Sequence, residues 1–220
     1  MFIGHFGVAL GAKRLAPRVS LGTLFLAAQF IDLLWPTLLL LGIERVRIEA
    51  GASGITPLAF EHYPYSHSLL MVGFWALLLG GFHLVMRRNG RNALLLGLLV
   101  LSHWLLDLLV HVPDLPLYPG PSPLLGLGLW QSLPLTLLLE GAIFVSGTVI
   151  YIRRTRPRDG QGRWGLVGLI ALLTLIQIGN LFGEPPPSVA AIAWLGQAQW
   201  LLVLWGYWVD QHRTVPPLSL

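Results

Sequence analysis

Residues 92–112 read NALLLGLLVLSHWLLDLLVHV. The stretch is long enough to cross the hydrocarbon core of a bilayer, which takes about 20 apolar residues in a helix. It also carries His103, Asp107 and His111 at intervals of four, which places all three on one face of that helix. An ionisable side chain inside a bilayer costs about 2.5 to 3.5 kcal/mol and marks a functional site by default. The stretch therefore predicts a membrane helix with a site built into it.

The composition of the whole chain agrees with a membrane environment. Of 220 residues, 55% are hydrophobic and only 11% are charged, whereas an ordinary soluble domain has about 25% charged residues. So few charges cannot cover the wet surface of a soluble globule, which argues against a soluble enzyme, a disordered chain and a nucleic-acid-binding domain. Because the chain has no Cys, disulfides, a thiol nucleophile and Cys-ligated metals are excluded.

Apolar runs of membrane-spanning length recur along the chain. They predict six spans, at about 19–42, 66–86, 92–112, 129–152, 164–183 and 188–209. Because lipid offers no hydrogen bonds to the backbone, these segments must be helices. We expect an all-α fold, a polytopic membrane helical bundle that forms a single domain over residues 1–220. Residues 1–16 are too short for a span and are expected to form an N-terminal interfacial or half-inserted helix packed on the bundle.

The basic residues indicate how the bundle is oriented. Twelve of the fourteen Lys and Arg residues fall on one side of the six predicted spans, and only Arg45 and Arg47 fall on the other. Loops rich in Lys and Arg stay on the cytoplasmic side. We therefore expect both termini inside and the loops 43–65, 113–128 and 184–187 outside, with the lipid bilayer as partner and no nucleic acid.

Several ionisable residues interrupt the apolar runs at similar depth. At a rise of about 1.5 Å per residue, Asp32, His103 and Asp107 fall in one layer of the outer half of the bundle, and His67 can join them. Pro36 follows Asp32 by one turn and predicts a broken helix beside a polar cavity. A His-x3-Asp pair can hold a divalent cation or form a hydrogen-bonded pair, and both alternatives stay open. Nitrogen and oxygen donors together suit Zn²⁺ or Mn²⁺.

The loop after residue 112 contains five prolines and no basic residue, so it is too stiff for a random linker. It either covers the site as a lid or only caps the bundle. Three acidic residues are candidates for a catalytic proton acceptor: Asp114, Glu61 and Glu140. Glu140 has an alternative as a protonated side chain hydrogen-bonded between helices. The candidate metal ligands are His5, Asp32, His67, His103, Asp107 and His111.

Three segments resemble the bacterial YdjM-like family of inner-membrane proteins, which are described as metal-dependent hydrolases. They read HFGVALGAKRLAPRVSLGTLFLAAQFIDLLWP (5–36), YPYSHSLL (63–70) and SHWLLDLLVHVPDLPLYPG (102–120), followed by GLGLW. The same order of residues is similar to the zinc-dependent phospholipase C fold, a helical bundle around a metal cluster. The resemblance covers residues 1–130 and implies a bacterial inner membrane, with ligands at His5, Asp32, His67 and the His103/Asp107 pair.

One departure from the family pattern concerns the number of metals. The usual D-x-D-H reads Asp32-Leu33-Leu34-Trp35 here, so a second carboxylate and a His are missing. The first functional hypothesis is a membrane-embedded hydrolase with one or two divalent metals, acting on a lipid or lipid-linked ester or phosphoester at the outer leaflet. The alternatives are a transporter or ion- or proton-binding membrane protein, and a structural partner whose buried charges only pair helices.

Overall fold

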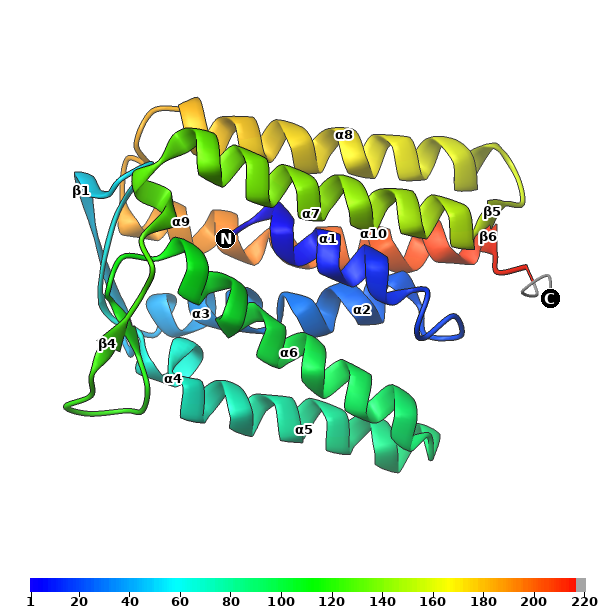
Figure 1. Ribbon diagram of the computed structural model, residues 1–220, viewed down its shortest axis with the longest axis horizontal. Coiled ribbons are helices and arrows are strands. Elements are labelled where there is room, and N and C mark those ends of the chain that lie inside the picture. The colour runs from blue at the N-terminus through cyan, green and yellow to red at the C-terminus, as the bar shows by residue number, and fades with distance from the viewer. Residues whose placement is uncertain (217–220) are drawn as a thin grey trace.

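The computed structural model describes residues 1–216 as a bundle of helices running roughly side by side (Figure 1). Five helical segments are long and apolar enough to cross a membrane, and the bent pair α2–α3 makes a sixth. The predicted all-α polytopic bundle is confirmed, and the chain is a multi-pass membrane protein. The five are α5 (Leu69–Arg87), α6 (Gly90–Val110), α7 (Leu133–Arg154), α8 (Gly160–Phe182) and the segment formed by α9 (Val189–Gln197) and α10 (Gln199–Gln211).

The first span is broken into α2 (Leu21–Ala28) and α3 (Phe30–Leu40), whose axes differ by 58°. The break lies at Gln29, and Pro36 sits inside α3. The expectation that the break would accompany Pro36 is therefore wrong in position. The last carbonyls of a helix lack intrahelical partners, so the break at Gln29 leaves the carbonyl of Ala28 free to accept a bond from another element.

The N-terminal helix α1 (Ile3–Ala12) lies inside the bundle, packed against α2, α6 and α7, with eight of its ten residues buried. Close approach to α7 requires small residues. A Cβ on Gly7 would lie 2.7 Å from the carbonyl oxygen of Ile143, and a Cβ on Gly147 would collide with the backbone of Gly7. This packing holds His5 in the interior.

Short strands connect the helices at the two ends of the bundle. β1 (Arg45–Ser53) and β2 (Thr56–His62) form an antiparallel hairpin, with Arg45 opposite His62 and Ile48 opposite Leu58. The sequence had indicated only an outer loop there. The short helix α4 (Pro64–His67) follows the hairpin and precedes α5. Two-residue strands β3 (Leu115–Pro116) and β4 (Leu124–Leu125) pair within the proline-rich loop, η1 (Leu129–Gln131) follows them, and β5 (Arg156–Pro157) pairs with β6 (Arg213–Thr214).

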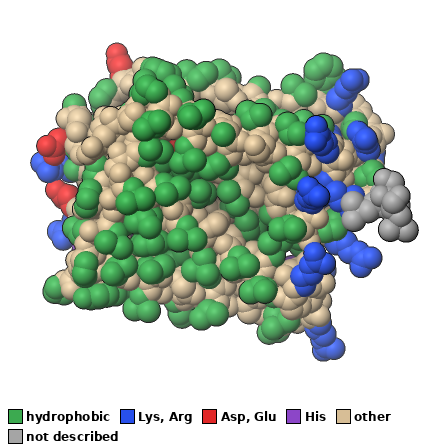
Figure 2. Space-filling model, in the orientation of Figure 1, with side chains coloured by type: hydrophobic (Ala, Val, Ile, Leu, Met, Phe, Trp, Pro, Cys, Tyr) green, Lys and Arg blue, Asp and Glu red, His purple; other side chains and the backbone are tan. Residues whose placement is uncertain are grey.

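The surface separates into an apolar flank and charged ends. Large apolar side chains project from the long helices, including Leu77 at 79% exposure and Leu138 at 70%. An apolar surface of this extent is typical of contact with lipid. Figure 2 shows Lys and Arg gathered at the end where α5 and α7 terminate, while acidic groups lie at the opposite end. The charge asymmetry predicted from the loops is therefore present in three dimensions.

Candidate metal centre

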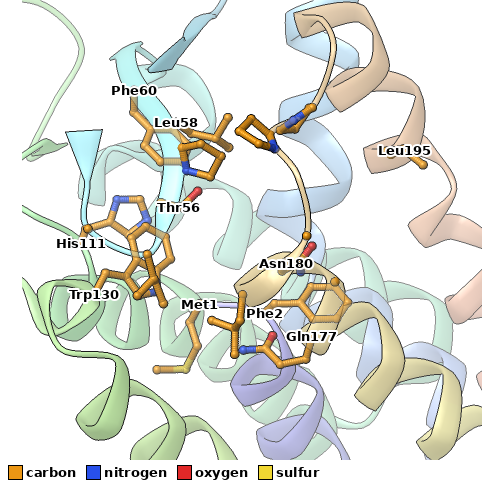
Figure 3. Close-up of a pocket in the computed structure, with 18 of the residues that line it drawn as sticks. Met1, Phe2, Thr56, Leu58, Phe60, His111, Trp130, Gln177, Asn180 and Leu195 are labelled. Carbon is orange, nitrogen blue, oxygen red and sulfur yellow. The ribbon is translucent and has the colours of Figure 1, made fainter. Parts of the chain in front are cut away.

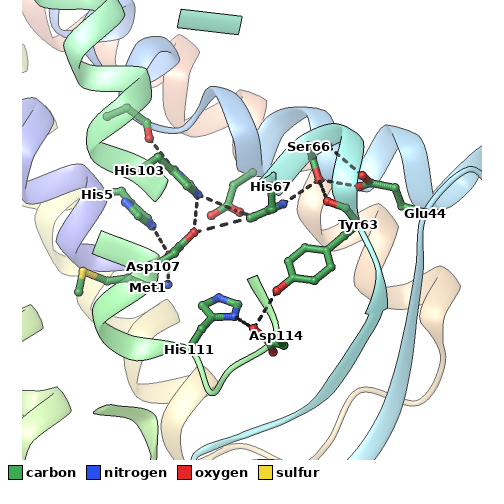
Figure 4. Close-up of polar contacts among 12 residues, drawn as sticks. Met1, His5, Glu44, Tyr63, Ser66, His67, His103, Asp107, His111 and Asp114 are labelled. Atoms are coloured by element: carbon green, nitrogen blue, oxygen red, sulfur yellow. Dashed lines mark hydrogen bonds and ion pairs between the residues drawn. The ribbon is translucent and has the colours of Figure 1, made fainter. Parts of the chain in front are cut away.

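Four side chains from three helices converge in the interior at the hairpin end of the bundle (Figure 4), and the ligand atoms of three of them, Asp32, His67 and His103, lie within 4.8 Å of one another. α3 supplies Asp32, α4 supplies His67, and α6 supplies His103 and Asp107. The Nε2 atom of His103 lies 3.1 Å from Oδ2 of Asp107 and 3.5 Å from Oδ1 of Asp32. The Nε2 atom of His67 lies 3.6 Å from the same Asp32 oxygen and 3.9 Å from the same Asp107 oxygen.

These separations lie near those in the ligand shell of a small cation. Ligands placed about 2.0 to 2.2 Å from a tetrahedral ion lie about 3.3 to 3.6 Å from one another. Two of the four separations, 3.5 and 3.6 Å, fall inside that interval, and the other two, 3.1 and 3.9 Å, lie on either side of it. Two His and two carboxylates thus present a donor set of the kind that Zn²⁺ and Mn²⁺ accept.

The tautomer of His103 also fits metal binding. Its Nδ1 lies 2.8 Å from the carbonyl oxygen of Ala28, and because a carbonyl can only accept, Nδ1 carries the hydrogen. Neutral His103 therefore has a lone pair on Nε2, which is buried and makes no hydrogen bond within residues 1–216. A lone pair facing two carboxylate oxygens is repulsive, and either a metal cation or a proton on Nε2 removes the repulsion. A backbone carbonyl that holds the distal nitrogen is the usual support of a ligating His.

His5 approaches the cluster from the other oxygen of Asp107. Its Nε2 lies 3.1 Å from Oδ1 of Asp107, and its ring stacks on His103 with centroids 3.7 Å apart. Its Nδ1 is buried and has no hydrogen-bond partner in the described chain. The α-amino group of Met1 lies 2.7 Å from the same Oδ1. His5, His103 and Asp107 also form a group whose ligand atoms lie within 4.8 Å of one another.

His111 belongs to a separate, neighbouring cluster. Its Nδ1 lies 2.9 Å from Oδ1 of Asp114, which also accepts a 2.8 Å bond from the hydroxyl of Tyr63. Burial, and then the charge of Asp114, raise the pKa of Tyr63 well above its ordinary value, so the hydroxyl remains a donor. His111 packs against Trp130 and is not among the two groups of ligand atoms that lie close enough to share an ion.

The other two acidic candidates lie in different surroundings. Glu140, on α7, is buried, and its Oε2 accepts a 3.1 Å bond from the backbone N–H of Phe2. Glu61, on β2, is exposed, and its Oε1 lies 2.9 Å from Nε of Arg47 on the neighbouring strand. The structure thus places Glu140 beside the cluster and Glu61 in a surface ion pair.

A cavity of about 790 Å³ adjoins the cluster (Figure 3). Asp32, His67 and Asp107 line it together with His111 and Glu140. The remaining wall is largely apolar, formed by the hairpin, the segment after α8, and aromatic side chains that include Phe2, Trp35, Phe60 and Trp130. Within the described part of the chain, no Lys or Arg lines this cavity.

Three residues of the site lay outside the sequence-based candidates: Glu44, Ser66 and Tyr63. The signal that could have found one of them, Ser66, is its adjacency to His67. Glu44 carries no such signal because it precedes a hairpin that the sequence did not predict.

The chain matches no protein family, no characterised protein and no solved structure.

Proposed function

We propose that this protein is a membrane-embedded, metal-dependent hydrolase whose substrate is a lipid or a lipid-linked ester or phosphoester. The observation that carries the proposal is the set of four donor side chains, Asp32, His67, His103 and Asp107, of which all but His103 line a cavity of about 790 Å³. The resemblance of residues 1–130 to the YdjM-like family supports the same reaction class. Zinc is the proposed metal, with manganese as the alternative.

A divalent metal at this site would supply the Lewis acidity that activates water and polarises a phosphoryl or acyl oxygen. Asp32, His67, His103 and Asp107 would hold it, with His5 supporting Asp107 from its second oxygen. Asp114 holds the Nδ1 hydrogen of His111, which leaves a lone pair on Nε2 to accept and return a proton. His111, which the sequence suggested as a ligand, thus becomes the proposed proton carrier, oriented by Asp114.

The lipid assignment rests on the cavity walls. Leu195 lines the cavity and is also 68% exposed on the flank of α9, so the apolar wall continues onto the lipid-facing surface. An acyl chain can lie along such a surface while its ester reaches the donor atoms. No Lys or Arg lines the cavity in residues 1–216, and the α-amino group of Met1 is already paired with Asp107, so a headgroup with several negative charges is disfavoured. The cluster lies at the end opposite the basic loops, which supports a site in the outer leaflet of a bacterial inner membrane.

Element analysis and a lipid assay on the full chain in detergent test the proposal. The wild type should contain stoichiometric zinc or manganese and release fatty acid or a headgroup from bacterial lipid extract. His103→Ala should lose both properties, whereas Asp159→Asn, a surface change at the other end, should keep both. A wild type without bound metal ends the proposal. Metal flux in proteoliposomes without any lipid product would instead support the transporter.

A further inference from the structure

We infer that Glu44 and Ser66 are positioning residues, which hold the imidazole of His67 in the tautomer that binds a metal. The inference rests on the proposed metal site and adds a hydrogen-bonded chain behind one of its ligands. All three side chains are buried, with 1% exposure for Glu44, 0% for Ser66 and 4% for His67. Glu44 lies between α3 and β1, whereas Ser66 and His67 lie on α4.

The direction of each hydrogen bond follows from the donors and acceptors available. Oγ of Ser66 lies 2.6 Å from Oε2 of Glu44, and since the carboxylate can only accept, the hydroxyl hydrogen points to Glu44. The same Oγ lies 2.7 Å from Nδ1 of His67 and has only lone pairs left for it. Nδ1 must therefore carry the hydrogen, which leaves the lone pair of neutral His67 on Nε2.

That lone pair points toward the other donor atoms. Nε2 of His67 lies 3.6 Å from Asp32 and 3.9 Å from Asp107, too far for hydrogen bonds but suited to ligands of one ion. His67 thus has the same Nδ1-protonated tautomer as His103. In His67 the hydrogen-bond acceptor is the Ser66 hydroxyl, whereas in His103 it is a backbone carbonyl. Partners of this kind behind a metal ligand contribute about 10- to 100-fold in metal affinity.

The orientation of Glu44 is itself fixed. Its Oε1 accepts two backbone bonds of 2.8 Å, from the N–H groups of Tyr65 and Ser66. In a Glu44→Gln variant, these two donors keep the amide oxygen on their side and turn the amide NH₂ toward Ser66. The NH₂ then donates to Oγ, the hydroxyl hydrogen turns to Nδ1 of His67, and the imidazole hydrogen moves to Nε2. The substitution of one atom thus inverts the tautomer and blocks the metal-facing nitrogen.

Zinc titration of the full chain in detergent, against a chromogenic chelator, tests the inference. Ser66→Ala and Glu44→Gln should each raise the dissociation constant for zinc by about 10- to 100-fold. Glu61→Gln, a matched change on the exposed face of the hairpin, should leave it unchanged. Nitrogen-15 NMR of labelled histidines, recorded without metal, should show His67 protonated on Nδ1 in the wild type and on Nε2 in Glu44→Gln.

A double-mutant cycle separates positioning from a general loss of structure. In a His67→Ala background, Ser66→Ala should change zinc affinity by no more than about twofold, because the residue it positions is gone. Equal losses in both backgrounds, or an unchanged tautomer in Glu44→Gln, would overturn the inference while leaving the proposed function intact. A wild type that binds no zinc overturns both.

Discussion

Two buried charged clusters lie at opposite ends of the bundle, and they differ in how completely they neutralise themselves. At the basic end, Nζ of Lys13 lies 2.6 Å from Oδ2 of Asp210 and 2.8 Å from the carbonyl oxygen of Val19. The hydroxyl of Tyr151 lies 2.9 Å from the other oxygen of Asp210. One acid thus meets one base, and each carboxylate oxygen has a donor.

In the cluster at the hairpin end, the acidic and basic groups do not pair one to one in this way. Asp32 and Asp107 face three imidazoles, and two buried ring nitrogens, on His5 and His103, make no hydrogen bond within residues 1–216. The contact of Met1 satisfies one oxygen of Asp107 only. The comparison teaches that burial of charge does not identify a functional site. A surplus of acceptors that converge on one point is the better indicator, because a bound cation completes it.

The largest expected effect follows from removing a converging donor. His103→Ala should weaken zinc binding by about a thousandfold or more, equivalent to about 4 kcal/mol, because it deletes the nitrogen that faces both Asp32 and Asp107. Element analysis after dialysis against a weak chelator measures the loss. Asp210→Asn, in the closed cluster, should retain full zinc. If both variants lose zinc, the distinction between the two clusters disappears.

The closed cluster should instead respond in folding stability. Lys13→Met leaves the carboxylate of Asp210 without its cation in a largely buried position, which should cost about 3 kcal/mol of unfolding free energy. A Lys13→Met/Asp210→Leu double variant removes both charges and should recover most of the loss. Denaturant titration in detergent measures both. A single variant as stable as the wild type would show that this pair contributes nothing.

Added zinc should stabilise the molecule through one cluster only. At a free concentration 100 times the dissociation constant, a ligand that binds only the folded state adds about 2.7 kcal/mol. The wild type should show this increase in denaturant titrations, His103→Ala should not, and Lys13→Met should show it in full on a lower baseline. A metal response in His103→Ala would place the cation elsewhere in the chain.

The helices could be predicted from the sequence because each span is fixed by its own apolar length. The predicted span 92–112 corresponds to α6 at Gly90–Val110, and 188–209 corresponds to α9–α10 at Val189–Gln211. The hairpin could not be predicted in this way, because its residues alternate only weakly in exposure and its stability depends on packing against the bundle. The break at Gln29 could not be predicted either, because neither Gln29 nor its two neighbours are Pro or Gly, the residues that usually interrupt a helix.

The site was only partly accessible from the sequence. The intervals of four along residues 103–111 correctly place His103 and Asp107 on one face, yet His111 follows the last residue of α6 and turns to Asp114. Helical periodicity holds only while the helix lasts, and a helix end cannot be fixed to one residue from sequence. The role of Glu44 could not be predicted, because its partners lie 21 to 22 positions away along the chain. The hairpin between them brings Glu44 and these partners together.

The smallest expected effect concerns an exposed ion pair at the basic end. This pair is solvated, unlike the two buried clusters compared above. Nδ1 of His212 lies 2.8 Å from Oδ2 of Asp159. The hydrogen bond from His212, with the N–H of Gly162, lowers the pKa of Asp159. A carboxyl whose pKa is lower in the folded state stabilises the fold above its unfolded pKa, and the contribution is lost as the pH falls through the folded value. The wild type should therefore lose slightly more stability than Asp159→Asn between about pH 5 and pH 2.

Because solvent screens this pair, the difference in melting temperature should not exceed about 2 °C. Thermal unfolding of both proteins in detergent, at matched ionic strength, measures it. Zinc content should be the same in both, because Asp159 lies at the end of the bundle away from the donor atoms. A larger pH-dependent loss in the wild type would mean that the basic end depends on this exposed pair as strongly as on Lys13 and Asp210. Burial would then not explain why charged pairs in this molecule differ in their contribution to stability.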